Sequence, residues 1–278
     1  MIYLLLAILS SVLISVIMRL SAAKVTGNIS MLAMNYLTCL SIAAGFAGVD
    51  RLWPADIALP ETLGMGAVHG GLYLFSFVLF QRNVQKNGMV LSSVFMKLGL
   101  LVPLVASIFL FSEMPTPLQW VGFAVAILSI ILINRQDSAA KTKMGWGLLI
   151  LLLAGGAGDA MSKMYEEWGA SHLADSFLLY TFATALLLCI GLMVFKKQRV
   201  GKYELLFGFL IGIPNFFSAK FLLQSLNTLP AVIVYPTFSV GTILVVTMIG
   251  ILLFKERLTA RQWVAVGGIL AALVMLNI

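Results

Sequence analysis

The residues best placed to do chemistry in this sequence are ionisable side chains inside long apolar segments. They are Arg19, His69, Lys97, Asp159, Lys163 and Lys220. An ionisable side chain within a membrane span costs free energy, so it usually faces a cavity or a partner and marks a substrate site, an ion pathway or a proton relay. We therefore expect these residues to include the binding site of the protein.

Lys97 lies deepest in its apolar segment. It stands about nine residues into the segment 88–112, which is roughly 13 Å at 1.5 Å per residue and close to the middle of a bilayer. A lysine side chain reaches the headgroups from a helix end but not from that depth. The nearby Gly99 and Pro103 would let the helix approach a cavity closely. We predict that Lys97 binds substrate; the alternative is a structural bond to facing carbonyls or to Asp159.

Other polar residues could complete a site around Lys97. Lys220 follows Asn215 by five residues in one apolar segment, Tyr235 lies in the next, and Asn35 lies near the amino terminus. A lysine offers a compact charge with three donors, which suits a phosphate or carboxylate, and an aromatic ring can cover an organic body. We predict that these four residues bind substrate together with Lys97. Lys220 shares the structural alternative given for Lys97.

The remaining candidates each have a structural alternative beside the predicted role in binding. Asp159 and Lys163 are four residues apart, so they share one helical face and could neutralise each other. Arg19 lies near the end of its segment, where a long cationic side chain commonly extends to the headgroups. His69 could be a neutral imidazole hydrogen-bonded to a neighbouring helix instead of a proton relay.

The balance of intramembrane charge predicts the class of solute. The cations Arg19, Lys97, Lys163 and Lys220 face a single carboxylate, Asp159. Buried positive charge in excess loses protons or recruits an anion. We therefore predict a secondary transporter that moves a small, anionic organic metabolite by alternating access. The alternative is an exporter of amino acids or amines coupled to protons through Asp159, and a lipid flippase or a structural subunit is a third class.

The sequence argues against an enzyme. It has two histidines, His69 and His172, with no paired intramembrane carboxylates, no metal-binding spacing and no phosphate-binding glycine loop. Cys39 and Cys189 both fall in apolar segments and suggest neither a disulfide framework nor a metal site. We expect no cofactor and no metal, and the net charge of +7 to report membrane topology, with no nucleic-acid partner.

The composition predicts the elements that must position these residues. Of the 278 residues, 61% are hydrophobic and 10% are charged, whereas soluble domains carry roughly 25% charged residues. A membrane-spanning helix needs about 20 mostly apolar residues. We place such helices at 2–23, 29–48, 62–81, 88–112, 118–134, 144–165, 173–195, 203–226, 229–254 and 259–278. The prediction is an all-α integral membrane protein of ten transmembrane helices.

The second half of the sequence repeats the first. The motif Glu-x-x-Thr-x-x-Gln-Trp starts at Glu113 and again at Glu256, an offset of 143 residues. In each copy we expect the threonine, Thr116 or Thr259, to cap the next helix and the tryptophan to lie at the membrane surface. The chain therefore divides into two five-helix repeats, 1–137 and 138–278, and the odd number of spans gives them opposite orientations in the membrane.

The loop charges predict how the chain crosses the membrane. Basic residues gather in cytoplasmic loops. With the amino terminus outside, the cytoplasmic loops would hold Lys24, Arg82, Lys86, Arg135, Lys141, Lys143, Lys196, Lys197, Arg199, Lys202, Lys255, Arg257 and Arg261. The external loops would hold only Arg51 and most of the acidic residues. We predict a multi-pass protein of the cell membrane with both termini extracytoplasmic.

Ten helices, an inverted five-plus-five repeat and the repeated corner motif resemble the drug/metabolite transporter superfamily, EamA type. The resemblance covers essentially the whole chain. It implies a secondary transporter with a central cavity walled by the first, third, fourth, sixth, eighth and ninth helices, and with the last helix of each half outside that ring. The implied partners are a small-molecule substrate, the lipid bilayer and a coupling ion or counter-substrate. The resemblance also implies cytoplasmic termini, whereas the loop charges indicate the reverse.

Overall fold

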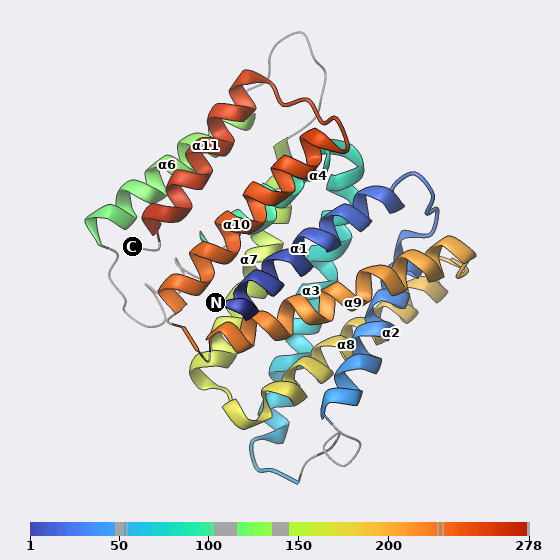
Figure 1. Ribbon diagram of the computed structural model, residues 1–278. Helices are drawn as coiled ribbons and strands as arrows, with labels where there is room; N and C mark the ends of the chain where they lie inside the picture. The colour runs from blue at the N-terminus through green and yellow to red at the C-terminus, as the bar shows by residue number, and fades with distance from the viewer. Residues whose placement is uncertain are drawn as a thin grey trace.

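The computed structural model describes residues 1–47, 53, 55–99, 101–102, 116–134, 145–226, 228–229 and 231–276. Within these residues the chain forms ten α-helices, a short 3-10 helix and no strand (Figure 1). The helices are α1 (Ile2–Ser21), α2 (Asn28–Ala47), α3 (Leu59–Asn87), α4 (Met89–Leu98), α6 (Pro117–Asn134), α7 (Gly145–Trp168), η2 (Ser171–Leu173), α8 (Ala174–Phe195), α9 (Lys202–Leu226), α10 (Ala231–Leu252) and α11 (Ala260–Leu276).

Each segment that the sequence predicts overlaps one of these α-helices, so the all-helical prediction is confirmed. Among the described residues, six helices are long and apolar enough to cross a membrane, and four shorter apolar helices accompany them. Because lipid offers the backbone no hydrogen-bond partners, a helix that bonds its own backbone is the element suited to this setting. The last part of the predicted segment 88–112 lies mostly outside the described residues.

The helices pack into two bundles, and each bundle contains helices from both halves of the sequence. In bundle one, α1 packs against α9 and α10, and α2 packs against α9. In bundle two, α3 packs against α7 and α8, and α4 packs against α7. The bundles meet along α2 with α8 and along α4 with α10, while α6 and α11 lie side by side at one edge (Figure 1). The space between these two seams is where a central cavity can form.

Glycines allow close approaches between helices inside each bundle. A Cβ at Gly70 of α3 would overlap the carbonyl oxygen of Thr181 in α8. A Cβ at Gly212 of α9 would lie 2.7 Å from the carbonyl oxygen of Asn35 in α2. Small residues at such crossings let membrane helices gain close van der Waals contact. These contacts hold α3 and α9, the helices that reach the centre of the protein.

Substituting Gly70 with alanine is expected to destabilise the protein by about 1–3 kcal/mol, because the added methyl group must push α3 away from α8. The matched control is Gly71→Ala, whose Cβ would lie 3.8 Å from Leu188 in ordinary contact. In thermal unfolding of the purified protein, Gly70→Ala should melt about 5 °C below the wild type and Gly71→Ala should not. Equal melting temperatures for the two variants would contradict this packing.

The corner motif forms the same cap in both copies. The Thr259 N–H donates to Gln262 Oε1 at 2.9 Å, and the Gln262 N–H donates to Thr259 Oγ1 at 3.3 Å. Thr116 and Gln119 make the same two bonds at the same distances. This reciprocal pair of bonds satisfies N–H groups that the first turn of a helix leaves free. The prediction that these threonines cap α6 and α11 is confirmed, and the tryptophan after each glutamine is about half exposed.

Candidate functional site

A cavity of about 330 Å³ lies between the two bundles. Helices α1, α9 and α10 of bundle one face α3, α4, α7 and α8 of bundle two across it. These helices include all six that the resemblance implies as walls, and α8 is an addition. Within the described residues, α6 and α11 contribute nothing to its lining. The lining mixes aromatic rings with serine hydroxyls and a few charged groups, as solute sites commonly do.

Lys97 faces this cavity from α4. Its Nζ lies 3.8 Å from the centre of the Phe238 ring in α10, which places the ammonium over the negative face of the ring. Helix α4 starts at a sharp turn, since Gly88 has φ = 83°, a left-handed value that glycine adopts without strain. The position of this turn therefore determines how deep in the cavity the last turn of α4, which carries Lys97, lies.

Asp159 of α7 faces the same cavity and interacts electrostatically with Lys97. Two glycines bring the residues together: a Cβ at Gly99 would lie 2.7 Å from the backbone nitrogen of Gly156. This close crossing of α4 and α7 comes two residues after Lys97 and three residues before Asp159. The cavity thus presents the ammonium of Lys97 and the carboxylate of Asp159 to the same space, and a second carboxylate, Glu166, lies at its exposed end.

His69 of α3 also lines the cavity, with both ring nitrogens hydrogen-bonded. Its Nδ1 lies 3.1 Å from Thr181 Oγ1 in α8, and its Nε2 lies 3.1 Å from Ser162 Oγ in α7. The ring stacks on Phe177 with centroids 5.1 Å apart. The structural alternative for this residue, an imidazole bonded to neighbouring helices, is therefore the arrangement observed.

Asn35 and Asn215 lie behind the cavity wall. The Tyr73 hydroxyl, which faces the cavity, donates to Asn215 Oδ1 at 2.7 Å. Asn215 Nδ2 in turn donates to Asn35 Oδ1 at 3.1 Å. Both asparagines are fully buried and neither lines the cavity. They orient the Tyr73 hydroxyl. The two asparagines that the sequence predicted as binding residues therefore support the residue that faces the cavity and do not face it themselves.

The other predicted cations lie against carboxylates. Lys220 Nζ lies 3.0 Å from Asp175 and also over the ring of Phe46. Lys163 Nζ lies 2.6 Å from Glu167. Arg19 Nε lies 3.5 Å from Glu256, and the Arg19 side chain is 32% exposed.

These three residues do not line the cavity. Because each cation has a nearby carboxylate, the excess of positive charge expected from the sequence does not arise at the site. Tyr235 falls within α10, but its side chain lies outside the described residues.

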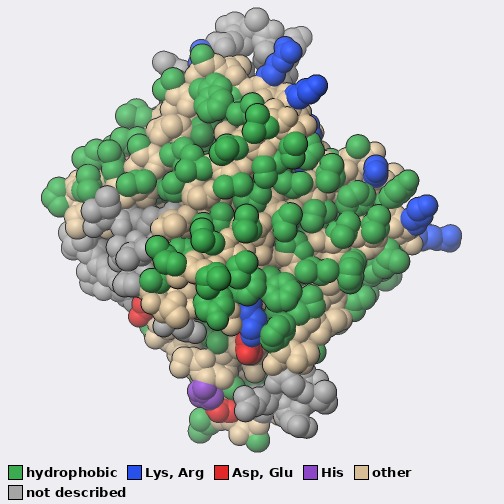
Figure 2. Space-filling view, in the orientation of Figure 1, with side chains coloured by type: hydrophobic (Ala, Val, Ile, Leu, Met, Phe, Trp, Pro, Cys, Tyr) green, Lys and Arg blue, Asp and Glu red, His purple; other side chains and the backbone are tan. Residues whose placement is uncertain are grey.

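The cavity is open toward one end of the protein and closed toward the other. The open end carries the acidic residues Asp56, Glu61, Glu166, Glu167 and Asp175. The closed end carries Lys24, Lys86, Lys196, Lys202 and Lys255. We call these the acidic end and the basic end, and Figure 2 shows Lys and Arg side chains gathered along its upper and right margins, with acidic and His side chains toward its lower margin.

Side chains at the two ends explain this asymmetry. The lining reaches Glu166 and Ser171, which are exposed at the acidic end. One helical turn beyond the last lining residue in the other direction, four helices each place a fully buried apolar side chain. These are Met18 of α1, Val84 of α3, Met89 of α4 and Val246 of α10. Met18 and Val84 belong to one apolar cluster and Met89 and Val246 to another, and we call these four side chains, which lie between the cavity and the basic end, the plug.

A polar contact fastens the loops beside the open mouth. His172 Nε2 of η2 lies 2.8 Å from Asp56 Oδ2 in the loop before α3. The Ala58 N–H, which donates to Asp56, and His172 together hold the pKa of this carboxyl below its usual value. Both groups adjoin bundle two, so the contact joins parts of one bundle.

Sequence reasoning did not single out Ser162, Glu166 or the α8 residues as lining the cavity. Ser162 and Glu166 follow Asp159 by three and seven residues, which is the spacing of one helical face. That spacing could have identified them once Asp159 was assigned to a cavity. The α8 residues give no such signal, because α8 is apolar on every side.

The chain is similar to several known proteins. The model of the EamA-like transporter family matches residues 142–278. A Proteus mirabilis protein named probable 4-amino-4-deoxy-L-arabinose-phosphoundecaprenol flippase subunit ArnE is 32% identical over 103 residues, which cover 34% of this chain and 89% of that protein. An uncharacterised protein of Haemophilus influenzae is 23% identical over 271 residues, which cover 94% of this chain and 92% of that protein.

A solved crystal structure shares the fold, with a TM-score of 0.61 at 14% sequence identity over 99% of this chain and 94% of the other. The family match and the similarity to ArnE agree with the ten helices, the apolar surface and the central cavity found here. Members of this family are membrane transporters of small molecules, so the chain is a multi-pass membrane protein. This protein belongs to the EamA-like transporter family of the drug/metabolite transporter superfamily.

Proposed function

We propose that this protein is a secondary transporter of a small organic solute that carries both an acidic and an amino group. The acidic group binds Lys97 and the amino group binds Asp159. The observation that carries the proposal is that these opposite charges face one cavity from adjacent helices, α4 and α7. The site joins the two solute classes expected from the sequence, an anion held by Lys97 and an amino acid or amine held by Asp159.

The surroundings of the other charges favour such a zwitterion over a plain anion. Lys220, Lys163 and Arg19 each lie against a carboxylate, which leaves Lys97 as the cation that faces the cavity among the described residues. A plain anion at Lys97 would also lie near the negative charge of Asp159. A plain amine at Asp159 would in turn lie near Lys97. A solute with both groups avoids both repulsions, because each charge meets its opposite.

The size and the lining of the cavity suit a solute of amino-acid dimensions. Its volume of about 330 Å³ is at the small end of the roughly 300–1,000 Å³ typical of ligand pockets. Phe238 and Phe177 line opposite walls and can cover an apolar side chain, while the Tyr73 hydroxyl and serine hydroxyls offer hydrogen bonds. Tyr235 stays a predicted binding residue of the same helix as Phe238.

Alternating access by two inverted repeats, 1–137 and 138–278, is the proposed mechanism. The helix contacts support the repeat because they come in matched sets: α1 with α9 corresponds to α7 with α3, and α2 with α9 corresponds to α8 with α3. Likewise, α1 with α10 corresponds to α7 with α4. An internal two-fold relation of this kind lets one site be exposed to each side of the membrane in turn. The bundles that rock would be bundle one and bundle two, since each has its own internal packing.

The orientation proposed from the loop charges places the basic end in the cytoplasm of the cell and both termini outside. The open mouth of the cavity would then face the exterior. Single cysteines introduced at Asp56 and at Val200, near the acidic and basic ends, should react with an impermeant thiol reagent from outside and from inside respectively. The opposite pattern of labelling would reverse the orientation.

Ligand-induced stabilisation tests the proposed solute class directly. The probes are phenylalanine, its amine analogue 2-phenylethylamine and its acid analogue 3-phenylpropionate, with leucine, isoamylamine and 4-methylpentanoate as a second set. A ligand that binds the folded protein raises its melting temperature by mass action. We expect a shift with at least one amino acid and smaller or no shifts with its two analogues. Shifts with the acids but not with the amino acids would instead support the plain-anion function.

A lipid-linked solute is the second candidate, because the relative ArnE is named as a flippase subunit for a lipid that carries an amino group and a phosphate. Such a headgroup has the same pair of charges as a zwitterionic metabolite. It would engage Lys97 and Asp159 while the lipid chain remains in the bilayer. Stabilisation by an amino-sugar phospholipid, with none by the water-soluble amino acids, would favour this candidate.

A further inference from the structure

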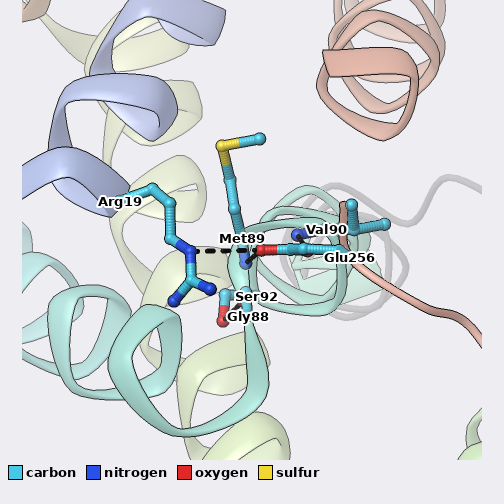
Figure 3. Close-up of polar contacts among 6 residues, drawn as sticks. All are labelled: Arg19, Gly88, Met89, Val90, Ser92 and Glu256. Atoms are coloured by element: carbon cyan, nitrogen blue, oxygen red, sulfur yellow. Dashed lines mark hydrogen bonds and ion pairs between the residues drawn. The ribbon is translucent and has the colours of Figure 1, made fainter. Parts of the chain in front are cut away.

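The Glu256 carboxylate, at the corner between α10 and α11, lies at the centre of a polar cluster at the closed basic end. Glu256 Oε1 accepts the Met89 N–H at 2.8 Å, and Oε2 accepts the Val90 N–H at 3.1 Å. Arg19 Nε lies 3.5 Å from the same oxygen, Oε1 (Figure 3). One carboxylate therefore contacts both the start of α4 and the end of α1.

Helix α4 depends on this remote carboxylate for its N-terminal cap. The first N–H groups of a helix have no partner within the helix, and a side chain at the N-cap position usually accepts from one of them. The N-cap residue of α4 is Gly88, which has no side chain. Met89 and Val90 are fully buried, so water does not reach their N–H groups in this conformation. Glu256 supplies the two missing acceptors.

The contact between Glu256 and α4 crosses from one bundle to the other. Glu256 follows α10 and Arg19 ends α1, both in bundle one, whereas the capped helix α4 belongs to bundle two. Close packing surrounds the contact, because a Cβ at Gly250 of α10 would overlap the side chain of Val90. The plug residues Met89 and Val246 are both buried and belong to one apolar cluster.

We infer that Glu256 is the tie that holds the basic end of the cavity closed, and that its release from α4 accompanies opening of that end. The inference rests on the proposed function, since a transporter must open each end in turn. Opening requires α4 to leave α10, which separates Glu256 from Met89 and Val90.

Arg19 lowers the cost of separating Glu256 from α4. Arg19 and Glu256 both belong to bundle one, so their ion pair stays together when α4 moves away, and the carboxylate keeps a positive partner. The freed N–H groups of α4 would then face the water that enters the opened end. Neither partner is left buried without a hydrogen bond, which is the costly outcome for a polar group.

Glu204 provides a matched control because it also accepts two backbone N–H groups beside the start of a helix, but within a single bundle. It accepts the Thr26 N–H at 3.1 Å and the Gly27 N–H at 3.0 Å, at the start of α2. Glu204 is also buried and also lies at the basic end, but α9 and α2 both belong to bundle one. Removing its charge should loosen a helix start without releasing one bundle from the other.

Thiol accessibility of a plug residue tests the tie. The reporter is Val246→Cys in a protein with Cys39→Ala and Cys189→Ala, and the measurement is its rate of reaction with a maleimide. We expect Glu256→Gln to raise this rate about tenfold, because glutamine lacks the charge that strengthens both hydrogen bonds. Glu204→Gln should change it less than about twofold. Equal rates in the two variants would overturn the inference.

Two further measurements separate opening of this end from general unfolding. In a second protein, Glu256→Gln with its native cysteines, Cys39 is fully buried between α2 and α9 and should stay unreactive if only the basic end opens. Labelling of Cys39 in that protein would show unfolding and overturn the inference. If Glu256→Gln does not fold, Glu256→Asp decides, because the shorter side chain keeps the charge but draws the carboxylate back from Met89 and Val90, so it should still raise the labelling rate; no increase would overturn the inference.

The experiment does not depend on any substrate. If none of the amino acids or their analogues stabilises the protein, the proposed solute class fails, yet a faster reaction of Val246→Cys in Glu256→Gln still supports the tie. If an amino acid stabilises both glutamine variants and the labelling rates are equal, the tie fails and the proposed function stands.

A contact between Gln81 and Asn28 also joins the bundles near this end, which is why we expect a tenfold and not a larger effect.

Discussion

Replacing Lys97 with glutamine is expected to weaken binding of the zwitterionic probe about 100-fold. Lys97 faces the cavity directly and, among the described residues, is the cation that lines it. Truncating one partner of a buried charge pair costs roughly 2–5 kcal/mol, since the other charge remains without its counterion. The measurement is the probe concentration that gives half of the maximal rise in melting temperature, compared between wild type and Lys97→Gln.

Lys220→Gln is the control for this result. It removes the same charge from another helix that borders the cavity, α9, but Lys220 lies against Asp175 and does not itself line the cavity. Its affinity for the probe should stay within about threefold of the wild type, because an ion pair remote from the solute changes binding little. Equal losses of affinity in Lys97→Gln and Lys220→Gln would remove Lys97 from its proposed role.

Replacing Asp159 with asparagine is expected to reverse the preference of the site. Phenylalanine should bind about 100-fold more weakly because its amino group loses its counterion. The acid 3-phenylpropionate should bind more tightly than to the wild type, because Lys97 no longer faces a fixed carboxylate. The same stabilisation measurements check both changes. A uniform loss of affinity for all probes would show that Asp159 supports the fold instead of selecting the solute.

Glu167→Gln is the matched control for Asp159→Asn, since Glu167 is a carboxylate of the same helix that lies against Lys163 and does not line the cavity. It should leave the preference among the probes unchanged. Under the alternative in which Asp159 carries protons and does not bind the solute, Asp159→Asn should instead abolish proton-driven uptake into proteoliposomes while solute exchange remains. A variant that still coupled uptake to a proton gradient would exclude this route for the protons.

The sequence predicted the features of the fold that depend on local chemistry. Apolar segments of membrane-spanning length located all ten helices, because a span must satisfy its own backbone. The two corner motifs predicted the caps at Thr116 and Thr259, since all their partners lie within four residues. Counting residues along one helix also predicts that Lys97 lies near the middle of the bilayer.

Contacts between distant segments were beyond the reach of that reasoning. Residue spacing placed Lys220 in one apolar segment with Asn215, but it did not show which side chains of other helices lie nearby, so the partner Asp175 could not be predicted. Likewise, the sequence suggested that the Arg19 side chain extends to the headgroups, whereas it forms an ion pair with Glu256 of the corner between α10 and α11. Each bundle contains helices from both halves of the sequence because specific helices pack closely, as α3 does against α8 at Gly70. The pattern of apolar residues does not reveal which helices pack together.

Counterflow into proteoliposomes tests the central claim most directly. Vesicles containing the purified protein are loaded with an unlabelled amino acid that stabilises it, and entry of the radiolabelled form is followed. The wild type is expected to accumulate label transiently, whereas Lys97→Gln and Asp159→Asn should not and Lys220→Gln should. Equal accumulation in all four proteins, or none in the wild type, would contradict transport through a site formed by Lys97 and Asp159.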